Sequence, residues 1–501
     1  MRNMARKKKE TALGLIPAAV GTTPTRRTVV TDMENARRLV ARYGDDLRYV
    51  TTHDHWLWWN GLRWEEDAML LVELLAKSVV RAIAKEADTI EDDDKRKKFL
   101  RAALAAEAYP RLRSMISFAR SEPGIPVVAS QLDTDPWLLN VKNGTVDLRT
   151  GILRPPRRED LITKLAPVEY HATATCPIFL KFLDRIMAGD QELIGFLQRM
   201  LGYCLTGVTS EQCFFIFHGT GANGKSTLLN TVRVILGDYA RHARTETLLA
   251  KRAEGIGNDV ARLHGARFVD AVEAESGRAL AEALVKQLTG GDPVTARFLY
   301  QEAFEFTPAF KLCLAVNHKP AIRGTDHAIW RRIRLVPFAV TIPQEERDSR
   351  LGHKLLDELP GILAWLVAGC RRWQTEGLGM VRAVREATEA YRGEMDALAQ
   401  FLAEQSVARV GDADLRVGKT ALYAAYCGWC TQTGQDQLSK SEFAKALVER
   451  GFTEGRSSQE RHWIGIALRA ETEGQEPSPD DPQGWRQALA HELAREAPAA
   501  A

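Results

Sequence analysis

The stretch that most constrains this chain is FFIFHGTGANGKSTLL, residues 214–229. Its apolar start predicts a buried strand, which ends in a glycine-rich turn and is followed by apolar residues at helical spacing. Gly219, four further residues and then Gly224, Lys225 and Ser226 fit the pattern G-x-x-x-x-G-K-[ST] of a phosphate-binding P-loop. A strand before this motif and a helix after it are the context that the motif requires. The sequence therefore predicts a strand–turn–helix unit that binds a polyphosphate.

The residue types of this turn suit a nucleoside triphosphate with its metal ion. Backbone N–H groups in a glycine-rich turn, and the dipole of the following helix, attract phosphate oxygens. Lys225 would neutralise the β- and γ-phosphates, and the hydroxyl of Ser226 would ligate Mg²⁺. We therefore expect ATP and Mg²⁺ as cofactors. The expected phosphate-binding residues are Gly219, Thr220, Gly221, Ala222, Asn223, Gly224, Lys225, Ser226 and Thr227.

The composition is typical of an ordinary globular protein. A chain of 501 residues predicts two to four domains, and 45% apolar with 27% charged residues is enough for sizeable cores. A net charge of +3 neither requires nor excludes nucleic acid, because a local basic stripe can be hidden in a balanced total. No apolar run is long enough for a membrane span, and the basic start lacks the apolar core of a signal peptide. We expect a cytoplasmic location and no membrane partner.

Two local patterns each have two interpretations. Cys427 and Cys430 match a redox C-x-x-C, but they lie in a helical pattern with no further zinc ligands nearby, so we favour packing. Four tryptophans between Trp56 and Trp64 surround Asn60-Gly61, a strong hairpin signal. They would form either the core of a small β unit, which we favour, or a platform on which bases stack.

Periodicity and composition divide the chain into seven parts. The expected parts are a disordered basic tail (1–28), an N-terminal α+β domain (29–165), a helical segment (166–206), an ATPase core (207–340), a second helical segment (341–408), a compact last module (409–469) and a flexible tail (470–501).

A carboxylate at the end of a neighbouring strand would complete a site that hydrolyses nucleotide. Residues 267–275, RFVDAVEAE, read as a strand that ends in acids. Glu273 is the candidate that holds Mg²⁺ through water, with Glu275 as its helper. Asp270 stays open as the alternative acid, because a charge in the middle of a strand is costly unless it is paired.

Two further segments carry candidate catalytic groups. Asn317 follows a second buried run, where its amide could orient the attacking water or contact the γ-phosphate; an ordinary turn residue is the alternative. Arg331 and Arg332 belong to a basic run at residues 330–335, WRRIRL. A guanidinium from one subunit can spread over the phosphate oxygens of its neighbour, although an exposed strand edge would also explain the charge.

In this order, GTGANGKST, VEAES, LAVNHKP and GTDHAIWRRIRLVPF resemble the phage and plasmid primase–helicase family, which includes the poxvirus-type nucleoside triphosphatase. That family belongs to the superfamily-three helicases, AAA+ ATPases that typically work as hexameric rings. The resemblance covers roughly residues 35 to 469. It implies an α/β fold with an AAA+ P-loop core, in which helices cover both faces of a parallel sheet. It also implies a mixed α+β N-terminal domain and a C-terminal winged-helix-like module.

The resemblance also implies roles for single positions. The catalytic positions are Lys225, Glu273, Glu275, Asn317 and Arg332, with Arg331 as the close alternative for the arginine finger. The metal positions are Ser226 and Glu273. Residues 292–306 match a hairpin that projects into the pore of the ring, where Arg297 would grip phosphate and Phe298 or Tyr300 would stack on bases. Asp270 stands where a small or apolar residue is expected, so the choice of acid stays open.

The implied function is an ATP-dependent replicative DNA helicase, a homo-hexamer that moves along single-stranded or forked DNA. The first 130 residues show no paired carboxylates and no zinc cluster, so we expect no priming activity. The alternative is an origin-binding ATPase that loads or recruits a host helicase and does not itself unwind DNA. Replication initiator or host replication proteins are further expected partners. In the last module, the basic residues that could contact DNA phosphates are Lys440, Lys445, Arg450, Arg456 and Arg461.

Overall fold

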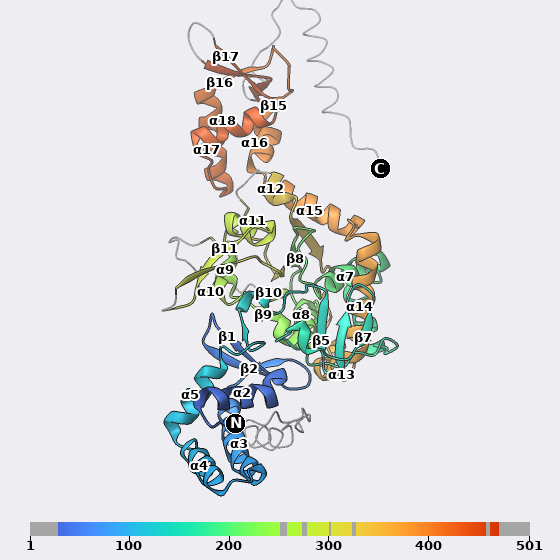
Figure 1. The fold of residues 1–501 in the computed structure, drawn as a ribbon. Coiled ribbons are helices and arrows are strands. Elements are labelled where there is room, and N and C mark those ends of the chain that lie inside the picture. Colours follow the sequence, from blue (N-terminus) through green and yellow to red (C-terminus); the bar gives the residue numbers. More distant parts are fainter. Residues whose placement is uncertain are drawn as a thin grey trace, which may run out of the picture. The chain divides into compact units, whose positions relative to one another are not determined.

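The computed structural model describes residues 29–250, 258–272, 278–299, 302–322, 327–456 and 461–469. The tails predicted for 1–28 and 470–501 lie outside the described residues, as do Glu273, Glu275 and Tyr300. The chain is a mixed α/β protein with several sheets, one of which is parallel (Figure 1). It forms two compact units. The first comprises the chain up to Pro320 together with Arg331–Arg385, and the second comprises Ala321–Trp330 and the chain from Glu386 onward.

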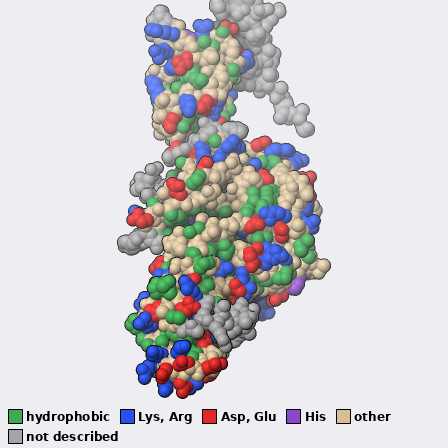
Figure 2. Space-filling view, viewed as in Figure 1, with side chains coloured by type: hydrophobic (Ala, Val, Ile, Leu, Met, Phe, Trp, Pro, Cys, Tyr) green, Lys and Arg blue, Asp and Glu red, His purple; other side chains and the backbone are tan. Residues whose placement is uncertain are grey.

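The first unit begins with a small α+β part. Its four-stranded sheet has the order β3-β2-β1-β4, in which only β1 and β4 run parallel. The strands are β1 (Leu47–Val50), β2 (His55–Trp59), β3 (Trp64–Glu66) and β4 (Pro126–Val127), and the helices are α2 (Asp32–Tyr43), α3 (Leu71–Glu86), α4 (Asp93–Ala105) and α5 (Tyr109–Ala119). Charged side chains of both signs cover the end of this part where α4 lies (Figure 2).

The tryptophans of this part belong to its core. Trp56, Trp59 and Trp64 are buried and Trp58 is partly buried, which confirms the core interpretation over the base-stacking platform. The predicted hairpin is also confirmed, since β2 and β3 pair antiparallel around a turn that contains Gly61 at a φ of +94°. A left-handed φ favours glycine, because it has no Cβ to clash.

A three-stranded meander and two helices lead into the parallel sheet. The strands β5 (Leu138–Val141), β6 (Gly144–Asp147) and β7 (Ile152–Arg154) pair antiparallel. The helices α6 (Pro177–Ile186) and α7 (Gln191–Tyr203) follow. Both helices lie within the segment 166–206 that was expected to be helical, and α6 begins at Pro177, where proline suits the first turn of a helix.

The five-stranded parallel sheet has the order β14-β8-β13-β10-β9. Its strands are β8 (Phe214–His218), β9 (Ala240–His242), β10 (Phe268–Val272), β13 (Lys311–Val316) and β14 (Ile333–Pro337). The short helices α9 (Thr245–Leu248) and α10 (Asn258–Ala261) lie between β9 and β10 along the chain. Every residue of β13 is buried, as is typical of parallel strands covered on both faces.

Between β10 and β13 the chain forms the helix α11 (Glu282–Gly290) and an antiparallel hairpin of β11 (Val294–Arg297) and β12 (Ala303–Phe306). This confirms the hairpin expected within residues 292–306. After β14, the helices α13 (Leu351–Asp357) and α14 (Leu359–Glu376) pack into the large core of the first unit. The helix α15 (Arg382–Met395) spans the boundary between the two units.

The second unit has its own core around Phe401, Tyr426, Phe443 and Trp463. It contains α12 (His327–Trp330), α16 (Ala397–Gln405), α17 (Lys419–Thr433) and α18 (Lys440–Glu449). Its strands β16 (Arg416–Gly418), β18 (Arg461–Ile464) and β17 (Thr453–Arg456) form one sheet, and β15 (Ser406–Ala408) pairs with β19 (Ile466–Leu468). Among the helices of the described ranges, none combines the length and the apolar character that crossing a membrane would need.

Candidate nucleotide site

The glycine-rich turn joins β8 to the helix α8 (Lys225–Leu236) at the carboxyl edge of the parallel sheet. Three of its positions need glycine. A Cβ on Gly219 would lie 2.3 Å from the carbonyl oxygen of Phe338, and Gly221 and Gly224 have φ values of +110° and +82°. A Cβ on Gly224 would also lie 2.7 Å from Ile186. The glycines of the motif are therefore explained by backbone conformation and close packing.

Lys225 begins α8 and points back into the turn. Its Nζ donates to the carbonyl oxygen of Gly219 (2.6 Å), to Oδ1 of Asn223 (3.1 Å) and to Oδ1 of Asn317 (3.2 Å). The side chain is buried, and this burial lowers the pKa of its ammonium group to about 8. Asn317 directly follows β13, so the hydrogen bond from Lys225 to Asn317 joins the turn after β8 to the end of the neighbouring strand β13. The structure thus brings together two predicted site residues that are 92 positions apart.

A pocket of about 310 Å³ opens at this edge of the sheet. Its walls are residues 221–227 of the turn and the start of α8, together with Val272, Ala315 and Asn317. Ser226 and Thr220 are exposed, whereas Asn223 is buried. The N–H groups of a helix N-terminus face the same pocket, so the arrangement can bind an anion of phosphate size.

The acidic candidates differ in their position relative to the pocket. Val272 ends β10 and lines the pocket, and the residues that follow it, including Glu273 and Glu275, lie outside the described residues. Asp270 does not line the pocket; it is fully buried at the middle of β10. Its Oδ2 accepts from Nη1 of Arg233 on α8 (3.2 Å) and from Nδ1 of His242 on β9 (2.7 Å). Asp270 therefore has the pairing that a charge in a buried strand needs, and it ties α8 to the sheet.

Both arginine candidates lie at the opposite edge of the sheet. Ile333 pairs with Phe214 at the start of β8, and Pro337 pairs with His218 next to the glycine-rich turn. The carbonyl oxygen of Arg332 accepts from the N–H of Phe214 (2.8 Å), so both arginines precede this end of β14. Five residues of strand, about 17 Å, separate them from the turn. Arg332 is buried, with 8% of its surface exposed, whereas Arg331 is exposed.

The β11–β12 hairpin has one apolar and one polar face. Phe298 stacks on Phe304, with 5.5 Å between ring centroids, and the rings of Phe304 and Phe306 both contact His264. Burial is the main cause of the lowered pKa of His264. Arg297 lies on the exposed face. Arg297 thus has the exposure that a phosphate contact needs, while Phe298 already has an aromatic partner within its own hairpin.

In the second unit, the five basic residues expected at DNA differ in their surroundings. Arg450 is held by Asp396, with Nη2 2.6 Å from Oδ1, so its charge is used within the unit. Lys440, Lys445, Arg456 and Arg461 are exposed. Cys430 is buried in the core and Cys427 packs against it, which confirms packing for this pair. In the described ranges, no cluster of three or more His, Cys, Asp or Glu side chains could hold a metal ion.

Sequence reasoning missed the buried cations at the opposite, amino edge of the sheet. Arg267 donates to the carbonyl oxygens of Leu205 (2.9 Å) and Leu138 (2.9 Å), and Lys311 donates to those of Thr206 and Val208 (3.2 Å to Val208). The available signal was a charged residue directly before β10 and another at the start of β13, two strands that are otherwise mostly apolar. These cations satisfy loop carbonyls and so fix the sheet to the chain that precedes it.

The fold and the site define the class of the protein as mixed α/β, with a candidate phosphate-binding turn at the carboxyl edge of a parallel sheet. Residues 36–188 match a family model described as "D5 N terminal like", and residues 217–332 match a family of unknown function, DUF5906. The apo structure of the NrS-1 C-terminal region aligns with 87% of this chain and 99% of its own, at 11% identity and a TM-score of 0.47.

Similar curated proteins come from large DNA viruses. The chain is 28% identical over 327 residues to "Putative helicase L207/L206" of Acanthamoeba polyphaga mimivirus, covering 61% of this chain and 34% of that protein. It is 26% identical over 439 residues to "Putative helicase 022R" of Frog virus 3 (isolate Goorha), covering 69% and 44%. It is 26% identical over 424 residues to "Putative primase C962R" of African swine fever virus (strain Badajoz 1971 Vero-adapted), covering 79% and 41%.

These matches support the resemblance of the chain's motifs to a phage and viral primase–helicase family. It spans less than half the length of these three viral relatives, between 34% and 44%.

Proposed function

We propose that this protein is an ATP-dependent DNA helicase of the superfamily-three, AAA+ type, which works as a ring of identical subunits. The observation that carries the proposal is the convergence of Lys225 and Asn317 in a pocket at the carboxyl edge of a parallel sheet. This edge is where open α/β sheets bind their ligands. A bound triphosphate would take the place of the carbonyl and amide oxygens as the partner of the Lys225 ammonium group.

The described residues fit ATP with Mg²⁺ in part. Lys225 and the N–H groups of the turn suit the phosphates, and the exposed Ser226 hydroxyl suits one ligand position of the metal ion. Val272 lines the pocket, which supports Glu273, the next residue along the chain, as the acid that completes the metal site. The ion pairs of Asp270 support a structural role for that residue.

The geometry of β14 supports an arginine finger that acts between subunits. Neither Arg331 nor Arg332 can reach its own subunit's turn across the length of the sheet. A guanidinium that contacts a neighbour's nucleotide has to leave the surface of its own subunit. We therefore propose Arg331 as the finger, in place of the initially favoured Arg332, because Arg331 is exposed and Arg332 is buried.

An unwinding assay tests this function. The protein is incubated with ATP, Mg²⁺ and a forked DNA duplex carrying a fluorophore and a quencher, and strand separation is followed over time. We expect ATP-dependent separation for the wild type and none for Lys225→Ala. ATP hydrolysis stimulated by DNA but without strand separation would support a second function, the origin-binding loader. The exposed cations of the second unit are the observation that favours this second candidate.

A further inference from the structure

The end of α8 that lies away from the nucleotide site is pressed against the segment that leads out of the N-terminal part. The helix runs from Lys225 to Leu236, so its first turn carries the proposed phosphate contacts and its last turn leads into Gly237. Gly237 has a φ of +52°, and a Cβ there would lie 2.3 Å from Cδ of Pro167. Twelve residues of helix form a rod of about 18 Å. A shift of this rod therefore acts directly on the segment around Pro167.

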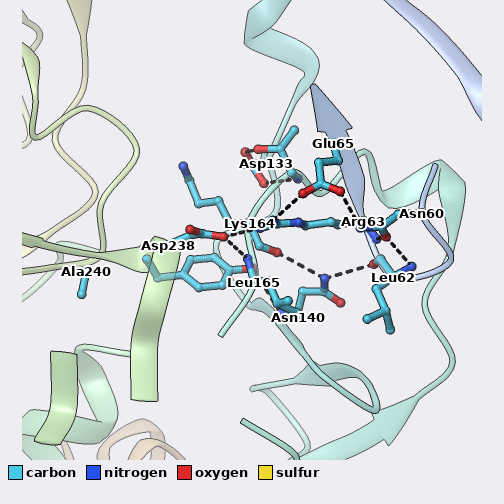
Figure 3. A network of polar contacts seen from close by, with 12 residues as sticks. Asn60, Leu62, Arg63, Glu65, Asp133, Asn140, Lys164, Leu165, Asp238 and Ala240 are labelled. Atoms are coloured by element: carbon cyan, nitrogen blue, oxygen red, sulfur yellow. Dashed lines mark hydrogen bonds and ion pairs between the residues drawn. The ribbon is translucent and has the colours of Figure 1, made fainter. Parts of the chain in front are cut away.

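Asp238, the next residue, bonds to two other parts of the first unit (Figure 3). Its Oδ2 accepts from the N–H of Leu165 (3.1 Å) and from the guanidinium of Arg63, in the β2–β3 turn. Its own N–H donates to the carbonyl oxygen of Leu165 (3.2 Å). Arg63 is held in place by Glu65, at 3.2 Å, so the donor to Asp238 is oriented within the N-terminal part. Hydrogen bonds between charged groups are among the stronger ones.

Asn140 also connects the β2–β3 turn, the segment before Pro167 and the turn after α8. Asn140 is 1% exposed, and its Nδ2 donates to the carbonyl oxygens of Leu62 (3.0 Å) and Lys164 (3.2 Å). Its backbone N–H donates to the hydroxyl oxygen of Tyr239, directly after Asp238 (3.1 Å). Asn140 is therefore bonded through its side chain to the β2–β3 turn and to the segment before Pro167, and through its backbone to the turn that follows α8. Buried polar groups with satisfied bonds resist displacement, because each broken bond leaves an unpaired group.

We propose that Asp238 and Asn140 form a junction that couples the nucleotide-binding start of α8 to the β2–β3 turn of the N-terminal part. The junction rests on the proposed function, since bound nucleotide is what displaces α8. Through it, the N-terminal part responds to the nucleotide state although it contributes nothing to the pocket described above. The test therefore measures the response at both ends of the junction, the start of α8 and the β2–β3 turn.

Hydrogen–deuterium exchange of the full chain measures both ends at once, with and without a non-hydrolysable ATP analogue and Mg²⁺. For the wild type we expect the analogue to slow exchange in residues 219–236 and to change it in residues 56–66. In Asp238→Ala, the change in 219–236 should persist and the change in 56–66 should fall by at least half. Asp46→Ala is the matched control, because Asp46 forms a similar ion pair with Arg158 (2.6 Å) that does not involve α8; it should respond like the wild type.

The outcomes separate the two proposals. No change in 219–236 of the wild type would overturn the nucleotide function itself. A change there without one in 56–66, or an unaltered response in Asp238→Ala, would overturn the junction and leave the nucleotide function standing. If Asp238→Ala does not unfold cooperatively, Arg63→Met removes the same ion pair and leaves the backbone bonds of Asp238 and Leu165 intact. It should then show the same loss in 56–66.

Discussion

Replacing Arg331 and Arg332 separately gives opposite expected results, because the two side chains differ in exposure. Arg331 is exposed, so Arg331→Ala should change the free energy of unfolding by no more than about 0.5 kcal/mol. Arg332 is 8% exposed and its guanidinium lies beside Gly290, so Arg332→Ala removes packed atoms and should cost on the order of 2 kcal/mol.

For ATP hydrolysis we expect the opposite order, with the larger effect from Arg331→Ala and the smaller one from Arg332→Ala. An arginine finger contributes on the order of a thousandfold or more to turnover, so Arg331→Ala should lose nearly all ATP hydrolysis while it still binds ATP. Steady-state hydrolysis, binding of a fluorescent ATP analogue and urea unfolding are measured on both variants. Because the proposed finger would act between subunits, Arg331→Ala protein added to the wild type should also lower the activity of the mixture. Wild-type turnover in Arg331→Ala, or lost turnover at wild-type stability in Arg332→Ala, would refute the reasoning.

Three further predictions concern charge and packing. Burial lowers the pKa of Lys311 to about 7, so above pH 7 the folded state loses a proton that the unfolded lysine keeps up to its ordinary pKa of 10.5. The free energy of unfolding of the wild type, relative to that of Lys311→Met, should therefore rise by about 2 kcal/mol from pH 7 to 9. A difference in urea unfolding that stays constant over this pH range would contradict this. Burial also lowers the pKa of Lys225, to about 8, so above pH 8 the ATP affinity should fall by up to about tenfold for each pH unit. Titration calorimetry measures this, and an affinity that stays constant up to pH 9.5 would disprove it. A Cβ on Gly202 of α7 would lie 2.1 Å from the backbone N of Cys370 on α14, so Gly202→Ala should destabilise the fold by about 3 kcal/mol in thermal unfolding. Gly195→Ala should be tolerated, because its Cβ would lie 3.7 Å from its nearest neighbour. Equal effects of the two variants would show that α7 and α14 can separate.

Motifs with strict spacing were the part of the site that the sequence could predict. The glycine-rich turn, the strand before it and the helix after it follow from local rules, and Asn317 follows from the end of a second apolar run. That Asn317 would bond to Lys225 depends on strand order, because β13 is placed next to β8 by pairing between distant segments. The roles of these residues in catalysis stay predictions.

Pairing between distant residues explains what the sequence left open. Asp270 was ambiguous because its partners, Arg233 and His242, come from a helix and a strand that precede it by about 30 residues. The sequence also could not predict that Arg331 is exposed and Arg332 is buried, because two adjacent arginines show no alternation of apolar and polar residues. The second helical segment was expected as one stretch (341–408), but α14 packs into the core of the first unit and α16 into the core of the second.

The central claim is that the pocket beside Lys225 hydrolyses ATP to drive strand separation. The most direct measurement follows ATP hydrolysis and unwinding of a forked duplex together, for the wild type and for Lys225→Ala, with Lys354→Ala as a control in which a surface ion pair with Asp348 is lost. We predict that the wild type and the control hydrolyse ATP and separate the strands, and that Lys225→Ala does neither. Hydrolysis and unwinding at the wild-type rate in Lys225→Ala would contradict the claim.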